Sequence, residues 1–387
     1  MLSTINGVFA AGDLIGSILA DILSAQPENT EGTGASNVNS FMSSMSAHMD
    51  EIACHPIMSA RIDAACAGFD IAGYNYMTAR YELDAAQNPH RVVVGSETYP
   101  PEIARNWALV KKLPSVIGDF TWTGWDYIGE AGIGIPAYRF GEGGFGAQFP
   151  CQLAFCGDID ITGFRRPASY FREIVFGLRQ SPYITVQDPA HYGEHLIKTT
   201  WIISDSHSSW SWPGFEGKPA IVEVYSPGTE VELLLNGTSL GKQPCGPAHN
   251  YTAYFEITYQ PGTLVAVAYD GDVELGRMEL TTAGTAVKLV AETEPAGEEL
   301  IYLDLSLQDE NGRIADAEDE ELCISVTGGA VLAGLGSGNP QPVYGYAGDT
   351  TRTYHGRTLA ILRRTDGSEI TITAVTDTGL KTYLSLT

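Results

Sequence analysis

The sequence is poor in the features that mark several classes of protein. Its six cysteines are scattered with no pair at C-x-x-C spacing, which favours buried free thiols over a disulfide framework, although an isolated disulfide stays open. Lys and Arg number only 22 against 47 acidic residues, and the net charge of -25 argues against nucleic acid or an anionic membrane as partner. The first twenty residues lack a basic segment, and Asp13 and Asp21 interrupt the longest apolar stretch. Neither a signal peptide nor a transmembrane helix is therefore predicted.

What the sequence has in quantity is apolar residues, glycine and tyrosine. The 387 residues are 44% hydrophobic and include 43 glycines and 19 tyrosines, enough for at least two cores in loop-rich β structure. The pattern of apolar and polar residues changes along the chain. Residues 1–190 alternate short apolar runs with helical patterns, as in parallel strands with crossover helices, whereas 191–283 and 284–387 alternate strands and turns. We therefore predict three domains with these boundaries, in a fold that combines α/β and all-β parts.

Four apolar runs in the first region are predicted to be parallel strands. They are "LSTING" (2–7), "DIAGYNY" (70–76), "VVVGSE" (92–97) and "SVIGDFTW" (115–122). Helices are predicted over 100–112, which has prolines at its start and lysines at its end, and over 166–180. Because the valine run of 92–94 has apolar residues on both faces, it is expected to be buried on both faces.

The two later regions have the pattern of β-sandwiches. Residues 220–241 read as a hairpin with Asn236-Gly237 as a turn signal, and the same period of two continues to the C-terminus. Each block is the size of an immunoglobulin-like sandwich, roughly 100 residues.

Glu97 stands at the carboxyl end of the valine-rich strand, where residues of an α/β barrel point into the active-site face. A carboxylate there is costly unless it is used or hydrogen-bonded. The neighbouring runs end in "GYNY" (73–76) and "DFTWTGWDY" (119–127), which would gather Tyr76 and Trp122 around it. Aromatic rings stack on the C–H face of a sugar and carboxylates accept bonds from its hydroxyls, so the pattern favours a sugar site.

These motifs together resemble glycoside hydrolase family 2, the β-galactosidase and β-glucuronidase family. The likeness rests on "DIAGYNY", "RVVVGSETYP", "GDFTWTGWDYIGE" and "GDIDITGFRRPASYFREIVF", and it continues into both sandwich regions. It implies a partial (β/α)8 TIM barrel, strands 5–8, followed by two immunoglobulin-like β-sandwiches. The resemblance also implies that Glu97 is the catalytic nucleophile, that Tyr76 hydrogen-bonds it and that Trp122 forms a sugar platform. Asn75, Trp125 and Asp126 are predicted to bind substrate.

The function implied is that of a retaining exo-β-glycosidase, a β-galactosidase that acts on terminal β-galactosides through a glycosyl-enzyme on Glu97. In this family the acid/base is the Glu of an Asn-Glu dipeptide, and no Asn-Glu occurs in the sequence. We therefore expect the chain to be the C-terminal part of an enzyme that lacks the acid/base and is inactive alone. Another family 2 activity, β-glucuronidase or β-mannosidase, is the alternative within the class.

A non-catalytic carbohydrate-binding or architectural module is the alternative from a different class, with Trp210 and Trp212 as its aromatic platform. No cofactor or metal is predicted, because His191, His195 and His207 lack the spacing of metal ligands. The expected partner is a β-linked galactoside or oligosaccharide, and a homo-oligomer is compatible with the sequence. A cytoplasmic bacterial location is expected, or a secreted one if a longer N-terminus carries a signal peptide.

Overall fold

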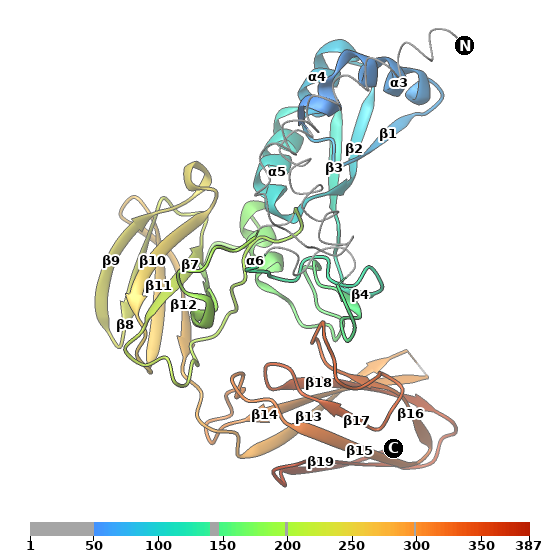
Figure 1. Ribbon diagram of the computed structural model, residues 1–387, viewed down its shortest axis with the longest axis vertical. Coiled ribbons are helices and arrows are strands. Elements are labelled where there is room, and N and C mark those ends of the chain that lie inside the picture. Colours follow the sequence, from blue (N-terminus) through green and yellow to red (C-terminus); the bar gives the residue numbers. More distant parts are fainter. Residues whose placement is uncertain (1–49, 140–146, 198–199, 298) are drawn as a thin grey trace.

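The computed structural model describes residues 50–139, 147–197, 200–297 and 299–387. Figure 1 shows three parts: a parallel sheet with helices in blue and cyan, a sandwich in yellow, and a second sandwich in orange and red that ends at the C-terminus. The predicted strand at 2–7 lies outside the described residues. None of the described helices is long and apolar enough to cross a bilayer.

The first part is a parallel sheet of three strands in the order β1-β2-β3. Its strands and helices follow each other as β1 (Ile71–Asn75), α4 (Arg80–Gln87), β2 (Val92–Thr98), α5 (Ile103–Lys112) and β3 (Val116–Thr121), with α3 (Pro56–Cys66) before them. The 3-10 turn η1 (Pro100–Glu102) leads into α5, so the predicted helix at 100–112 is confirmed. The second predicted helix is shorter than expected, because α6 (Pro167–Val175) ends before Gly177, whose φ is +77°.

One prediction about this sheet was wrong. The valine run was expected to be buried on both faces, but only Val93 is fully buried, whereas Val92 and Val94 are half-buried. Helices pack on one face only of the described sheet, where Val93 joins Ala72, Tyr74 and Val116 in a small core. A run of valines cannot reveal that, within the described residues, helices pack on only one face of the sheet.

Two β-sandwiches follow. The first pairs the sheet β10-β7-β6 with the sheet β12-β11-β8-β9, and the second pairs β13-β14-β18-β16 with β17-β15-β19-β20. The strands of the first are β6 (Tyr183–Val186), β7 (Pro219–Tyr225), β8 (Glu230–Leu235), β9 (Thr238–Pro244), β10 (Thr252–Thr258), β11 (Thr263–Asp270) and β12 (Val273–Thr281). Those of the second are β13 (Lys288–Ala296), β14 (Leu300–Gln308), β15 (Glu321–Gly328), β16 (Ala330–Gly336), β17 (Thr350–Arg352), β18 (Arg357–Arg364), β19 (Ile370–Thr376) and β20 (Lys381–Leu386).

Local sequence explains the first hairpin. Asn236 and Gly237 have φ of +52° and +79°, the left-handed pair that a two-residue hairpin turn requires, and they join β8 to β9. Each sandwich has its own buried apolar cluster. The strand β6 already belongs to the first sandwich, although it precedes the predicted boundary at residue 191.

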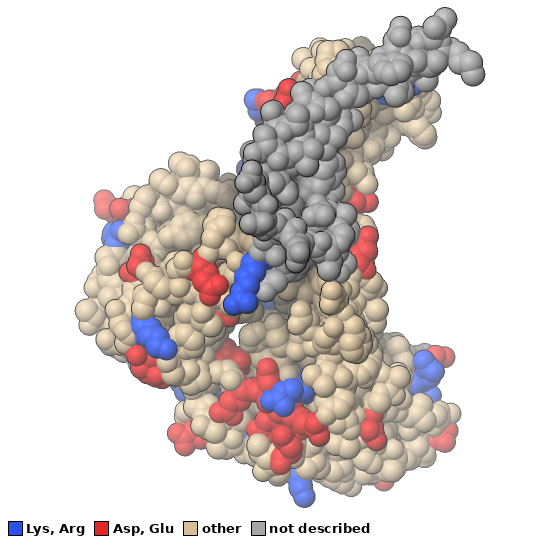
Figure 2. Space-filling model, in the orientation of Figure 1, with Lys and Arg blue, Asp and Glu red and all other residues tan. Residues whose placement is uncertain are grey.

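A third cluster joins the α/β part to the first sandwich. Phe171 and Ile174 of α6 pack with Tyr183 and Tyr225 of the sandwich, and Tyr170 stacks on Tyr183 with ring centroids 4.0 Å apart. Between α5 and α6 run loops that contain the short pair β4 (Tyr127–Ile128) and β5 (Leu153–Ala154). Acidic side chains lie over both sandwiches on the face shown in Figure 2, as the net charge of -25 requires.

All six cysteines are free. Cys151, Cys156 and Cys245 are buried, as predicted for structural thiols, and burial raises the pKa of Cys245 to about 11. Cys323 is exposed, on β15.

Candidate active site

Glu97 lies near the carboxyl end of the central strand β2, and its side chain is half-buried. In the parallel register it stands opposite Asn75, the last residue of β1. On the other side the backbone N–H of Trp122 donates to the carbonyl of Thr98 over 2.9 Å, which ties the end of β3 to β2. The three strand ends therefore meet at one edge, with the carboxylate in the middle.

Tyr76 directs its hydroxyl to Glu97. Its N–H donates to the Glu97 carbonyl over 2.7 Å, and its φ of +57° turns the chain directly after β1. Its phenol lies beside the Glu97 carboxylate, and its ring contacts the ring of Trp201. Burial raises the pKa of Tyr76 well above its usual value; Trp201 acts in the opposite direction and the nearby Glu97 carboxylate in the same one, so the hydroxyl stays protonated and can donate.

An aromatic wall surrounds this pair. Tyr76 stacks on Tyr99 with centroids 4.2 Å apart, and Trp201 meets both rings edge-on at 6.0 and 5.5 Å. Trp122 is half-buried and packs with the same group of side chains, and its indole N–H donates to the Tyr127 hydroxyl over 3.2 Å. The Tyr127 hydroxyl in turn donates to the carboxylate of Glu130. A carboxylate beside several aromatic rings has the chemistry of a sugar-binding site.

The side chains of Asn75 and Trp125 are both exposed. The Asn75 side chain is exposed, and its Oδ1 accepts a bond of 2.7 Å from the Ser96 hydroxyl. Trp125 is 50% exposed and its backbone bridges to Ile159. Among the described residues, no hydrogen bond joins either side chain to Glu97 or Tyr76.

Asp126 was predicted to bind substrate, but its carboxylate is occupied by contacts within the protein. Its side chain is buried, accepts the Gly157 N–H over 2.6 Å and forms an ion pair with Arg166, whose Nη1 lies 3.1 Å from Oδ1. Burial raises the pKa of Asp126 to about 6, although Arg166 and the Gly157 N–H act in the opposite direction. The structure thus gives Asp126 the role of fixing the loop that carries Trp125, and it does not bring the carboxylate to Glu97.

Sequence reasoning missed Tyr99, Tyr127 and Trp201. Tyr99 and Tyr127 lie inside motifs that were already noted, two positions after Glu97 and five after Trp122, so proximity in the sequence was a usable signal. Trp201 gave none, since it follows the predicted end of the α/β region and reaches Tyr76 only through the fold.

The proposed aromatic platform of a binding module is not exposed. Trp210 is 1% exposed within the core of the first sandwich and donates its indole N–H to the Gln260 carbonyl over 3.0 Å. Trp212 is partly buried against the same core. In the part of the chain that the structure describes, no three His, Cys, Asp or Glu side chains lie close enough together to hold a metal ion.

Comparisons with known proteins agree on one family. Residues 290–383 match the domain described as glycoside hydrolase family 2 C-terminal domain 5, and residues 217–276 match a domain of unknown function, DUF4982. The chain is similar to beta-galactosidase BoGH2A of Bacteroides ovatus, with 24% identity over 66% of this chain and 26% of that protein. The sequence thus spans about a quarter of the length of this curated relative.

Solved structures extend the likeness to the α/β part. A glycosyl hydrolase family 2 member from Bacteroides cellulosilyticus has a TM-score of 0.76 and 30% identity, and the match covers 88% of this chain and 47% of that one. A beta-glucuronidase from glycoside hydrolase family 2 has a TM-score of 0.56 with 16% identity, over 74% of this chain and 27% of that one, and shows a shared fold only.

Proposed function

We propose a glycosidase function from the premise that this chain belongs, in its C-terminal domains, to glycoside hydrolase family 2. In this proposal β1, β2 and β3 are strands of a (β/α)8 barrel, the two sandwiches are immunoglobulin-like, and Glu97 is the nucleophile of a retaining exo-β-glycosidase. The observation that carries it is the position of Glu97 at the carboxyl edge of a parallel sheet, beside the Tyr76 phenol and bordered by aromatic rings.

The chemistry assigns each side chain a step. The Glu97 carboxylate attacks the anomeric carbon and forms a glycosyl-enzyme, while the leaving oxygen takes a proton from a second carboxyl group about 5–5.5 Å away. Water, deprotonated by that second group, then releases the sugar. Tyr76 holds the Glu97 carboxylate by a hydrogen bond before the attack. Trp122 stacks on the sugar ring.

We propose that the second carboxyl group comes from outside this sequence. Asp126 is engaged by Arg166, and Glu130 accepts from the Tyr127 hydroxyl in an exposed loop, so neither is placed to protonate a leaving group. The exposed apolar side chains of the parallel sheet also favour a missing partner layer: Ile71, Ile117 and Phe120 are 49%, 56% and 66% exposed. On this proposal the sequence alone has no glycosidase activity.

The substrate we favour is a terminal β-galactoside, since a similar curated protein is named a beta-galactosidase. β-Glucuronides are the alternative, but the Asn-Lys pair that typically holds their carboxylate in this family is missing from the sequence. Hydrolysis of nitrophenyl β-galactoside, β-glucuronide and β-mannoside by the longer parent protein separates these substrates. A β-glucuronide preference would overturn the galactosidase assignment and leave the nucleophile assignment intact.

A 2-fluoro-galactoside tests the nucleophile directly. In the parent protein it is expected to label Glu97, as read by peptide mass spectrometry, and Glu97→Gln should abolish both labelling and turnover. Glu130→Gln is the matched control, because it removes a nearby carboxylate that has no role in the proposed attack, and it should keep the label. Labelling of another carboxylate would contradict the proposal.

For location we propose the bacterial cytoplasm, with secretion as the alternative if the parent protein has a signal peptide. Fractionation of cells that express the parent protein distinguishes the two.

A further inference from the structure

A chain of two hydrogen bonds joins Trp122 to an exposed carboxylate. The indole N–H of Trp122 donates to the Tyr127 hydroxyl over 3.2 Å, and that hydroxyl donates to the carboxylate of Glu130. The Tyr127 ring also meets the indole in a T-shaped contact, with ring centroids 5.7 Å apart and planes at 83°. One side chain therefore holds the indole twice, by a hydrogen bond at its nitrogen and by a ring contact.

The two ends of this hydrogen-bond chain fix its direction. An indole N–H only donates and a carboxylate only accepts, so the Tyr127 hydroxyl accepts from Trp122 and donates to Glu130. Burial, followed by the bond to Glu130, raises the pKa of Tyr127 well above its usual value, so the phenol stays protonated and keeps both bonds. Because a hydroxyl that donates to a carboxylate is polarised and accepts more strongly, Glu130 strengthens the bond from the indole.

The backbone brings Tyr127 and Glu130 together. Tyr127 begins β4, which pairs with β5, and the N–H of Gly129 donates to the carbonyl of Gln152 over 3.0 Å. Glu130 has a φ of +42°, a left-handed conformation that is uncommon outside glycine. The turn after β4 thereby returns the Glu130 carboxylate to the hydroxyl of the residue three positions earlier.

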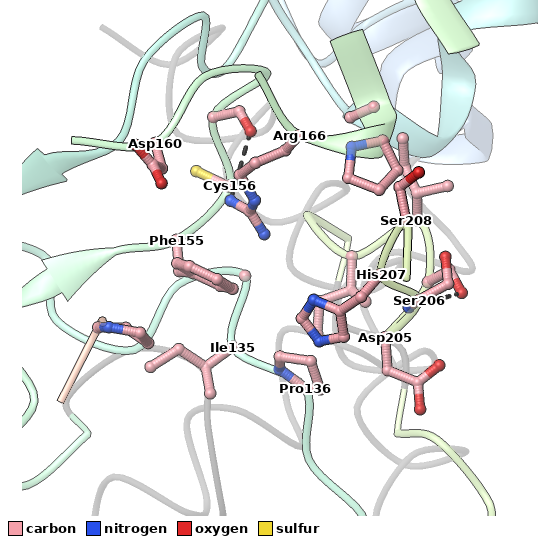
Figure 3. Close-up of a pocket in the computed structure, with 18 of the residues that line it drawn as sticks. Ile135, Pro136, Phe155, Cys156, Asp160, Arg166, Asp205, Ser206, His207 and Ser208 are labelled. Atoms are coloured by element: carbon pink, nitrogen blue, oxygen red, sulfur yellow. Dashed lines mark hydrogen bonds between the residues drawn. The ribbon is translucent and has the colours of Figure 1, made fainter. Parts of the chain in front are cut away.

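The residue directly before Tyr127 supplies a second anchor. The buried carboxylate of Asp126 pairs with Arg166, whose guanidinium carbon lies 3.6 Å from the centroid of the Phe155 ring. Figure 3 shows Arg166 and Phe155 at the wall of a cavity that none of the three residues of the hydrogen-bond chain lines. The segment that carries Tyr127 is thus fixed by buried contacts of its own, which gives the hydroxyl a fixed position against which the indole is held.

We propose that Tyr127 is a positioning residue of the sugar platform: it holds the Trp122 ring at the angle that stacking on a sugar requires, and Glu130 orients its hydroxyl. This inference rests on the proposed function, in which Trp122 stacks on the sugar that Glu97 attacks. Trp122 is only half-buried, so packing alone does not fix the indole, and the bond to Tyr127 adds the missing restraint. Tyr127 acts through Trp122 and takes no part in the bond changes.

The first test observes the Trp122 indole in the chain itself and needs no catalysis. The chain has six tryptophans, and in a sample with 15N-labelled tryptophan the indole N–H resonance lost in Trp122→Phe belongs to Trp122. Tyr127→Phe removes the hydroxyl and keeps the ring, so it should shift this resonance upfield while the other five change little. Tyr192→Phe is the matched control, since it removes a hydrogen bond from another tyrosine to a glutamate, Glu256, and should leave the Trp122 resonance in place.

Variants of Glu130 test the other end of the hydrogen-bond chain. Glu130→Gln keeps an acceptor for the Tyr127 hydroxyl and should leave the Trp122 resonance close to its original position. Glu130→Ala removes the acceptor and should shift the resonance in the same direction as Tyr127→Phe, by a smaller amount. Because Glu130 is exposed, these variants also decide the question if Tyr127→Phe fails to fold.

The second test measures kcat and KM in the longer parent protein, with the nitrophenyl glycoside that it hydrolyses best. Stacking is present both before and during the reaction, so Tyr127→Phe should raise KM by roughly three- to tenfold, the range that one neutral hydrogen bond supplies, and change kcat by less than about twofold. In the Trp122→Phe background the same substitution should have no further effect, because no indole N–H remains to be held.

Three results would each overturn the proposal: an unchanged Trp122 resonance in Tyr127→Phe, equal shifts in Glu130→Gln and Glu130→Ala, or the full rise in KM when Tyr127→Phe is made in the Trp122→Phe background. Failure of the proposed function is a separate result. It would appear as no labelling of Glu97 by the 2-fluoro-galactoside, and the resonance of Trp122 does not depend on that reaction.

Discussion

The parallel sheet and the second sandwich differ in how completely each buries its own apolar side chains. In the sandwich Leu303, Leu362 and Ile372 are all 0% exposed, since each sheet covers the other. In the parallel sheet Ile117 and Phe120 of β3 remain 56% and 66% exposed. Within the part of the chain that the structure describes, the two sheets of the sandwich cover each other, whereas helices pack on only one face of the parallel sheet.

The helices on the sheet contribute a buried network of charged side chains. Arg80 is 0% exposed and pairs with Asp84 at 2.7 Å, and Asp84 also lies 3.4 Å from Arg91 and accepts from the Tyr74 hydroxyl. Such a network depends on each of its members, because a buried charge that loses its partner is costly.

Removal of the Arg80 charge should have the largest effect on stability. Arg80→Met breaks the pair with Asp84 and the bond of 2.7 Å to the Ala53 carbonyl, so we expect the sheet to lose about 3–5 kcal/mol of stability. Hydrogen exchange should show lower protection in β1, β2 and β3 and unchanged protection in β14 and β18. Equal loss in both regions would mean that they unfold as one unit and that the comparison does not hold.

A cavity made in the core of the second sandwich should have the second-largest effect on stability. Leu303→Ala removes a side chain that is 0% exposed and should lower the free energy of unfolding by about 3 kcal/mol, as seen by urea denaturation. Ile117→Ala is the counterpart in the sheet, and because that side chain is 56% exposed we expect a change within about 0.5 kcal/mol. A large cost at Ile117 would show that its face is covered in solution.

Local signals predicted the parts that depend on few residues. The Asn236-Gly237 turn needs only its own two left-handed residues, and α5 needs only its prolines, its apolar spacing and its terminal lysines. The meeting of Tyr76 with Glu97 also followed from the sequence, because carboxyl ends of parallel strands share one edge.

The surroundings of the other site residues depend on tertiary contacts with distant parts of the chain. Asp126 and Trp125 are neighbours in a motif, yet one is buried against Arg166, forty residues later, and the other is half exposed. Trp201 reaches Tyr76 from beyond the predicted domain boundary. These contacts join residues that are far apart in the sequence, and no regular spacing in a single sequence reveals them.

His207 and Asp126 should make the free energy of unfolding depend on pH in the acidic range, in opposite directions. Its pKa in the folded chain is lowered to about 3 from 6.5, so the unfolded chain binds the extra proton between these values. Stability is therefore present above pH 6.5 and is lost as pH falls toward 3, by at most about 1.4 kcal/mol per pH unit. Asp126 acts oppositely: its pKa, raised to about 6 from 3.8, makes stability fall as pH rises between these values.

The variants His207→Gln and Asp126→Asn separate the two contributions. Relative to the unmodified chain, His207→Gln should lose less stability between pH 6 and pH 4, whereas Asp126→Asn should no longer gain stability as pH falls in that range. Urea denaturation at several pH values measures both slopes. Stability curves parallel to that of the unmodified chain would show that neither group titrates as its burial indicates.

Loss of an exposed ion pair should have the smallest effect on stability, and that effect should be the same in the α/β part and in the first sandwich. Lys112 of α5 lies 2.5 Å from Glu82 of α4 in the α/β part, and Arg277 lies 2.6 Å from Glu274 in the first sandwich, with all four side chains at least 39% exposed. Solvent screens such pairs and each costs side-chain entropy, so Lys112→Gln and Arg277→Gln should leave the denaturation midpoint unchanged within error. If Lys112→Gln alone lowers the midpoint, surface charge helps to hold α4 and α5 on the sheet. The difference between the regions would then extend from the buried network to the exposed face of its helices.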